Sequence, residues 1–147
     1  MKLTSFTDYS LRVLIYLAAR PEERATIAAI AAAFAIKENH LTKVVHFLGR
    51  QGWVETVRGK GGGLQLAKAP EEVCIGDVVR QTEGADLPAE CFDREHNTCR
   101  IAPVCHLRGV LREATLAFHA VLDRCTLADL VKNRTQLAPL LAPLLAA

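Results

Sequence analysis

Apolar residues recur every three or four positions through residues 7–51, a period that predicts α-helices. The first helix is expected to begin at Thr7, where a hydroxyl followed by the charge of Asp8 suits a helix N-terminus, and to end before Pro21. Thr26 can cap a short second helix, and a third helix follows a short turn and runs to Gly52, a natural C-cap. Two helices joined by a short turn predict a helix-turn-helix.

After the third helix the period of apolar residues changes to two, which predicts strands. Residues 53–57 alternate in polarity, and a second strand through residues 64–66 ends before Pro70. The turn between them contains Gly59, Gly61, Gly62 and Gly63. This arrangement predicts a two-stranded β-hairpin, the wing of a winged helix, with Trp53 as a core anchor.

A helical period returns in residues 75–83, where Gly84 is expected to end a short helix, and a loop follows over residues 85–103. A long helix is expected from about Val104 to Cys125. Its apolar positions are spaced 4, 3, 4, 3 and 4 apart: Leu107, Leu111, Ala114, Phe118, Val121 and Cys125. A small chain has little else to cover such a heptad stripe, so the spacing predicts a dimerisation helix.

Together these elements predict a mainly α fold with a small two-stranded β wing, a winged helix-turn-helix followed by a long C-terminal dimerisation helix. The expected organisation is a DNA-binding domain over residues 1–84, a cysteine-rich loop over residues 85–104, and the helix and tail over residues 105–147. Thr126 is expected to cap a last short helix. Residues 138–147 predict either a frayed end or a packed terminal helix.

The amino-acid composition indicates the expected cellular location. Half of the 147 residues are apolar and 23% are charged, as expected of a globular protein. No apolar run approaches the roughly 18 residues of a membrane span, and the N-terminus has no signal-peptide core. A cytoplasmic protein without a membrane partner is therefore expected.

The net charge of +2 hides an asymmetry that indicates a polyanionic partner. Residues 37–68 carry six cations against two acids, whereas residues 71–95 carry eight acids against two cations. The candidate DNA contacts are Glu38, Asn39, His40 and Lys43 on the third helix and Arg58 and Lys60 on the wing. For the helix alone, a solvated amphipathic face fits equally well; the basic, glycine-rich hairpin favours DNA. The hairpin lacks the spacing of a phosphate-binding P-loop.

Three of the five cysteines, Cys91, Cys99 and Cys105, cluster with the spacing C-x7-C-x5-C. An odd count of cysteines suits a disulfide framework poorly, and the short C-x2-4-C knuckles of zinc sites are absent. Soft thiolates suit an iron–sulfur cluster, which takes four ligands, so another residue, another subunit or an exogenous group must supply the fourth. Thiol catalysis with His96 or His106 as base lacks a known motif. Cys74 and Cys125 are expected to be buried structural thiols.

Several segments together resemble the Rrf family of winged-helix transcription regulators, and within it the nitric-oxide-sensing repressors. They are LTSFTDYSLRVLIYLA, VETVRGKGGGLQLAKAP, IGDVVRQTEG, CRIAPVC and TLADLV, in order over residues 1–135. The resemblance implies a homodimer that binds palindromic operator DNA. It also implies a cluster on Cys91, Cys99 and Cys105, with a fourth ligand matching Asp8 of the partner subunit and Arg12 orienting that carboxylate.

Three candidate functions remain to be distinguished. The first is a repressor whose cluster, 4Fe-4S by preference or 2Fe-2S, is nitrosylated by nitric oxide, its effector. The second is an iron-responsive or general redox-responsive regulator, because the iron-responsive branch shares the cysteine spacing. The branch that regulates cluster assembly has a histidine three residues after its last cysteine, where this chain has Arg108. The third is a thiol–disulfide redox enzyme, which leaves the predicted wing unexplained.

Overall fold

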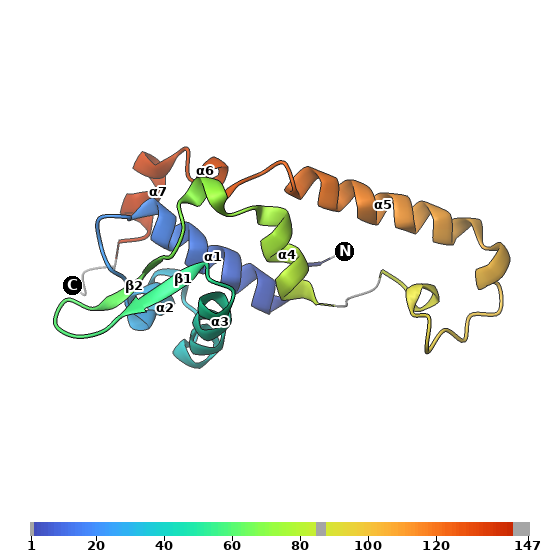
Figure 1. Cartoon of the computed structure of the whole chain (residues 1–147), viewed down its shortest axis with the longest axis horizontal. Coiled ribbons are helices and arrows are strands. Elements are labelled where there is room, and N and C mark those ends of the chain that lie inside the picture. Colours follow the sequence, from blue (N-terminus) through green and yellow to red (C-terminus); the bar gives the residue numbers. More distant parts are fainter. Residues whose placement is uncertain (1, 85–87, 143–147) are drawn as a thin grey trace.

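The computed structural model describes residues 2–84 and 88–142 as a helical body with a projecting arm (Figure 1). Residues 85–87 of the predicted loop and 143–147 of the tail lie outside this description. The helices are α1 (Ser5–Ala19), α2 (Ile27–Phe34), α3 (Glu38–Arg50), α4 (Ile75–Glu83), α5 (His106–Leu122), α6 (Leu127–Leu130) and α7 (Arg134–Leu140), and the strands are β1 (Val54–Val57) and β2 (Gly63–Leu66). The predicted fold class is confirmed.

Helix α1 begins one turn earlier than the sequence pattern predicts. Thr4 is the N-cap, and its hydroxyl accepts a hydrogen bond from the Thr7 backbone N–H at 3.2 Å. Thr7, the predicted cap, lies inside the first turn and is fully buried. The prediction of Thr7 was wrong because Thr4 is also held by tertiary contacts, in which its N–H and hydroxyl donate to Glu83 at the end of α4.

Helices α2 and α3 form the predicted helix-turn-helix. The Thr26 side chain caps α2 by accepting from the Ala29 N–H, and Ala35 ends the helix in the left-handed conformation with φ of 52°. At the end of α3, Gly52 has φ of 73°, and the Trp53 N–H donates to the carbonyl of Leu48. This is the glycine-dependent helix ending that the sequence predicts.

The predicted wing is confirmed as an antiparallel pair of strands in which Val54 faces Leu66 and Val57 faces Gly63. A third segment extends it, because Ala25 and Leu64 exchange two backbone hydrogen bonds of 3.1 and 2.7 Å. A Cβ on Gly63 would lie 2.7 Å from the Ala25 carbonyl oxygen, so this close approach requires glycine. The wing is therefore attached to the segment between α1 and α2.

After α4 the chain leaves the body, forms the cysteine loop, and returns along α5, which makes the arm (Figure 1). Gly84 ends α4 with φ of 66°, as predicted. The return is fixed by two backbone hydrogen bonds of 2.9 Å, from the Ile75 N–H to the Cys125 carbonyl and from the Leu127 N–H to the Val73 carbonyl. Helix α6 then packs on the body, with Leu127 fully buried.

The core of the body surrounds α1. Residues with no exposed side-chain surface come from α1, α2, α3, α4 and α6, and they include Leu14, Ile30, Leu41, Val78 and Leu127. Trp53 is buried as predicted, whereas Phe118 is only partly buried against this core. Within residues 2–84 and 88–142, no helix is long and apolar enough to cross a membrane.

The capping of α6 makes stability depend on pH. Hydrogen bonds from Lys132 and from the Thr126 N–H and hydroxyl lower the pKa of Asp129 to about 2. Because the folded pKa lies below the unfolded value, the charged form stabilises the fold at neutral pH, and this stabilisation is lost as pH falls through about 2. Asp129→Asn should therefore lower the midpoint of urea unfolding at pH 7 and have a smaller effect at acidic pH.

Urea titrations across this range would measure the difference, with Glu113→Gln on the exposed face of α5 as the control for losing one negative charge. A difference between wild type and Asp129→Asn that stays constant with pH would contradict the assigned role of the carboxylate.

Candidate nucleic-acid interface and cysteine loop

Helix α3 has one buried face and one face open to solvent. Its buried residues Leu41, Val44, Val45 and Leu48 pack into the core with α1 and α2. Its exposed face carries all four residues that the sequence suggests as DNA contacts, Glu38, Asn39, His40 and Lys43. They lie in the first two turns of the helix, the end from which a recognition helix contacts bases.

Two aromatic contacts attach α3 to α1. Phe6 and Phe47 meet edge to face with ring centroids 5.3 Å apart, and Tyr9 stacks on His40 at 6.2 Å. His40 is thus in contact with α1 as well as exposed. Sequence reasoning missed Tyr9, because no local pattern relates residues in different helices.

Both basic residues of the wing, Arg58 and Lys60, are exposed. The wing itself is held by Arg24, which the sequence analysis did not single out. Its guanidinium donates to the Gly61 carbonyl at 2.8 Å and to the Gln65 side chain at 3.2 Å. Because Arg24 precedes Gly61 by 37 residues, no local sequence signal identifies this contact.

The three clustered cysteines lie in one loop between α4 and α5, at the end of the arm remote from the body (Figure 1). Cys91 is in a short 3-10 turn (Glu90–Phe92), Cys99 lies in the following loop, and Cys105 is the N-cap of α5. All three thiols are free and half-buried. Among the described residues, no three potential ligands come together in metal-binding geometry. The donor chemistry therefore suits a thiolate-bound cluster, but this conformation of the loop does not gather the donors.

Hydrogen bonds within the loop involve acidic side chains. Glu90 accepts two hydrogen bonds of 2.6 Å, from the hydroxyl and the N–H of Thr98, and both lower the pKa of its carboxyl. Asp93 accepts from the backbone N–H groups of Glu95 and His96, which lower its pKa in the same way. The carboxylates at the start of the loop thus organise the residues that precede Cys99.

Asp8 lies in the first turn of α1 and is paired with Arg12. Two contacts join them, at 3.1 Å from Nε and 2.9 Å from Nη2, and the Arg12 guanidinium also lies over the Phe34 ring. The Asp8 side chain remains 43% exposed. Within one chain α1 belongs to the body, so Asp8 and the loop cysteines are not brought together (Figure 1).

The other two cysteines are less buried than predicted. Cys74 and Cys125 are both half-buried, because they flank the backbone hydrogen bonds where the arm returns to the body. The Cys74 thiol lies 3.7 Å from the Asp123 carbonyl oxygen, and Cys125 packs against the core. The two thiols are therefore half-buried rather than buried as expected, and neither cysteine lies in the loop.

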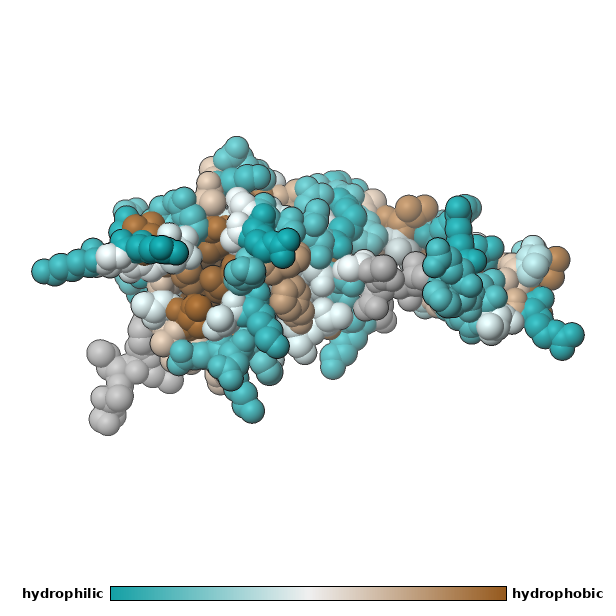
Figure 2. Space-filling model, turned by 60° about the horizontal axis from the view of Figure 1, so that its bottom comes forward, coloured by the Kyte–Doolittle hydropathy of each residue, from teal (hydrophilic) through white to brown (hydrophobic). Residues whose placement is uncertain are grey.

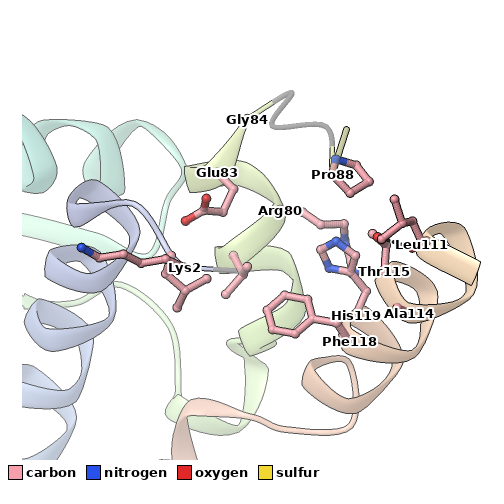
Figure 3. A pocket seen from close by; sticks show the side chains of 12 residues that line it. Lys2, Arg80, Glu83, Gly84, Pro88, Leu111, Ala114, Thr115, Phe118 and His119 are labelled. Atoms are coloured by element: carbon pink, nitrogen blue, oxygen red, sulfur yellow. Dashed lines mark hydrogen bonds between the residues drawn. The ribbon is translucent and has the colours of Figure 1, made fainter. Parts of the chain in front are cut away.

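A groove of about 780 Å³ separates α5 from the body (Figure 3). Its floor is formed by the start of the chain and by α4, and its far wall by Leu111, Thr115, Phe118 and His119 of α5. The ring nitrogen Nδ1 of His119 is buried and has no hydrogen-bond partner among the described residues.

Further apolar side chains on or beside α5 are uncovered. Leu107, Val110 and Val121 are 52 to 60% exposed, and Val104 just before the helix is 79% exposed. Figure 2 shows hydrophobic side chains at the surface both of the body and toward the end of the arm. The predicted stripe is therefore divided, with Leu111 and Phe118 facing the groove and Leu107 and Val121 facing solvent.

Comparison with known proteins identifies the family to which this architecture belongs. The family model described as "Rrf2: Iron-dependent Transcriptional regulator" matches residues 3–133. The chain is 56% identical over 142 residues to the HTH-type transcriptional regulator NsrR of Bacillus subtilis, covering 96% of this chain and 97% of the relative. It is 52% identical to the regulator of the same name from Geobacillus kaustophilus, with the same two coverages.

Solved structures agree with the sequence comparison. The T. potens IscR structure has a TM-score of 0.73 at 27% identity, covering 90% of this chain and 88% of that one. The structure of CymR, the global cysteine regulator of B. subtilis, has a TM-score of 0.69 at 30% identity, covering 90% and 98%. The relatives are transcriptional regulators and not enzymes, which removes the thiol–disulfide enzyme hypothesis. This chain belongs to the Rrf2 family of DNA-binding transcriptional regulators.

Proposed function

We propose that this chain is a nitric-oxide-responsive repressor that binds palindromic operator DNA as a homodimer. Its DNA affinity is controlled by an iron–sulfur cluster on Cys91, Cys99 and Cys105. The observation that carries the proposal is the placement of three free thiols in one loop, on an arm anchored to the body that bears the exposed face of α3. The high identity to regulators named NsrR supports it.

DNA recognition is assigned to α3 and the wing. Asn39 and Lys43 project from the exposed face of α3 and can reach base edges in a major groove. Glu38 and His40 lie beside them. Arg58 and Lys60 on the wing are suited to phosphates, because the neighbouring glycines permit close approach to the DNA backbone.

Dimerisation is assigned to α5. Leu107, Val110 and Val121 form an apolar surface that the described part of one chain leaves open. His119, whose buried Nδ1 has no partner among the described residues, lines the groove between α5 and the body. A second copy that packs on this arm would cover the apolar surface. Two reading helices must lie about 34–36 Å apart to enter successive major grooves, so a small rotation at the dimer axis is enough to weaken operator binding.

The fourth ligand is assigned to Asp8 of the partner subunit. Asp8 is half-exposed and is not gathered with the cysteines of its own chain, so its carboxylate can serve as a ligand only for the loop of a partner subunit. Arg12 orients that carboxylate through its two contacts. When bound, the cluster supplies iron that reacts with nitric oxide; three thiolates and one carboxylate favour the 4Fe-4S form, with 2Fe-2S as the alternative.

The same helix that carries Asp8 packs on the reading helix. Phe6 contacts Phe47, and Tyr9 contacts His40. A change in how Asp8 is held would therefore move the N-terminal turn of α1 against α3. This connection provides a physical route from the cysteine loop to DNA affinity.

An iron-responsive regulator is the second candidate. The description of the matching family model as iron-dependent favours it, and the cysteine spacing is compatible with it. In that case loss of iron, rather than nitric oxide, would be the physiological signal. The DNA-reading and dimer assignments are the same for both candidates.

One titration distinguishes the nitric-oxide-responsive function from the iron-responsive function. Protein purified without oxygen should be coloured, and nitric oxide at stoichiometry comparable to the cluster should bleach it and release a fluorescent operator duplex. A chelator at the same concentration should release little DNA. Release by chelator but not by nitric oxide would favour the iron-responsive function. Within this experiment Cys99→Ser should remove the colour and Cys125→Ser should retain it.

Neutralising the wing should weaken DNA binding irrespective of sequence. Arg58→Ala and Lys60→Ala should each reduce the dependence of log affinity on log salt by about 0.9 for every phosphate contact removed. Asn39→Ala should instead change the preferred operator sequence. The control Arg134→Ala, at the start of α7, removes an exposed cation outside the proposed interface. Salt slopes equal to wild type for both wing variants would remove the wing from the DNA contact.

Mixed dimers test whether Asp8 acts across the subunit interface. Asp8→Asn homodimers should lose the cluster faster than wild type, and Cys99→Ser homodimers should hold none. A heterodimer of these two chains has one complete site only if Asp8 serves the partner's loop. It should then hold half the cluster content with wild-type lifetime, measured by absorbance decay under chelator. A heterodimer as labile as Asp8→Asn would contradict the assignment.

A further inference from the structure

The segment between the first two loop cysteines is closed by a side chain that is not a thiol. One oxygen of the Glu90 carboxylate, Oε1, accepts both the N–H and the hydroxyl of Thr98 at 2.6 Å. Glu90 directly precedes Cys91, and Thr98 directly precedes Cys99. This pair of hydrogen bonds therefore brings together the two residues that directly precede Cys91 and Cys99.

A second contact connects the same turn to the third cysteine. The Arg108 guanidinium lies over the ring of Phe92 at 5.8 Å. Phe92 directly follows Cys91, and Arg108 is in the first turn of α5, which Cys105 caps. The turn around Cys91 is thus attached on one side to the Cys99 segment and on the other to the helix that begins at Cys105.

Further hydrogen bonds order the residues between these contacts. The Asp93 side chain accepts from the N–H groups of Glu95 and His96 at 2.9 and 3.1 Å. The Asn97 side chain accepts from the Cys99 N–H at 3.0 Å. These contacts hold the loop partly folded, although its thiols are not gathered among the described residues.

We propose that Glu90 is a positioning residue for cluster binding: by closing the segment between Cys91 and Cys99, it prepares the loop to receive iron. The inference rests on the proposed cluster function and adds a residue to it. Its physical basis is the entropy of loop closure, because bringing distant ligands together costs less when the chain between them is already closed. The Arg108–Phe92 contact has a similar effect on Cys105, because it holds the start of α5 against the turn around Cys91.

The rival role for Glu90 is direct ligation of iron. The two roles predict different behaviour for variants of this residue. Glu90→Gln keeps a side-chain carbonyl that can accept from Thr98 but loses the anionic oxygen that would bind iron. Glu90→Ala loses both. Glu95→Ala is the matched control, because it removes an equal charge from the same loop and its carboxylate takes no part in the contact with Thr98.

The first readout is the lifetime of the cluster. Anaerobic protein is mixed with a chelator, and the decay of charge-transfer absorbance is followed. Glu90→Ala should decay about threefold faster than wild type, the size expected for exposed charged hydrogen bonds. Glu95→Ala should decay like wild type, and Glu90→Gln, which keeps weaker neutral hydrogen bonds, should lie between wild type and Glu90→Ala.

The second readout uses metal-free protein and does not depend on the cluster. A short bis-maleimide is added to reduced protein, and the Cys91–Cys99 cross-link is quantified by peptide mass spectrometry. Cross-linking should be slower in Glu90→Ala, and in Thr98→Pro, which loses both donors, than in wild type, Glu90→Gln and Glu95→Ala.

The outcomes separate this inference from the proposed function. Colourless wild-type protein would overturn the proposed function. It would also overturn the proposal that Glu90 closes the loop in order to receive iron. Coloured wild-type protein with unchanged decay and cross-linking in Glu90→Ala would overturn the inference alone. A Glu90→Gln variant as labile as Glu90→Ala, beside a wild-type-like Glu95→Ala, would overturn positioning in favour of ligation.

Discussion

The position of the cysteine loop depends on the backbone hydrogen bonds that join residues 73–75 to residues 125–127. They return the chain to the body after the arm, so the loop and α5 form an excursion with a fixed base. Arg80 on α4 reinforces this base by bonding to Asp123 at 2.7 Å, and this contact lowers the pKa of Asp123. A Cβ on Gly76 would lie 1.9 Å from the Asp123 carboxylate, so this carboxylate occupies its present position only because residue 76 has no side chain. Together with Phe118 and Leu122, which pack against the core, this attachment sets the direction of α5 relative to the body.

Helix α1 is the second constraint. It lies at the centre of the core, and its N-terminal turn is held to the end of α4 by the bonds from Thr4 to Glu83. The same turn carries Asp8 and contacts α3 through Phe6 and Tyr9. One rigid element thus connects the base of the arm with the reading helix. A rigid connection of this kind converts a small change at one end into a displacement at the other.

The wing and the loop are organised by the same means. In each, a charged side chain forms a hydrogen bond with the backbone beside a candidate residue. Arg24 donates to the Gly61 carbonyl beside Lys60, and Glu90 accepts from the Thr98 N–H beside Cys99. Both contacts are exposed, so they add little to global stability. Their effect is to restrict the conformations of short segments, and a restricted segment loses less entropy when it binds a partner.

The sequence by itself determined the secondary structure and the chemistry of the candidate residues. Apolar periods of 3.6 and two identified α2, α3, the wing and α5, because those periods reflect burial of one face, and glycines marked the ends of α3 and α4. Tertiary structure decided the rest. Thr4 rather than Thr7 caps α1 because Glu83, far along the chain, binds it. Cys74 and Cys125 are half-buried because they flank the return of the arm. The roles of Arg24, Tyr9 and Glu90 depend on which segments meet in space, and that is set by packing of the whole chain rather than by any local pattern.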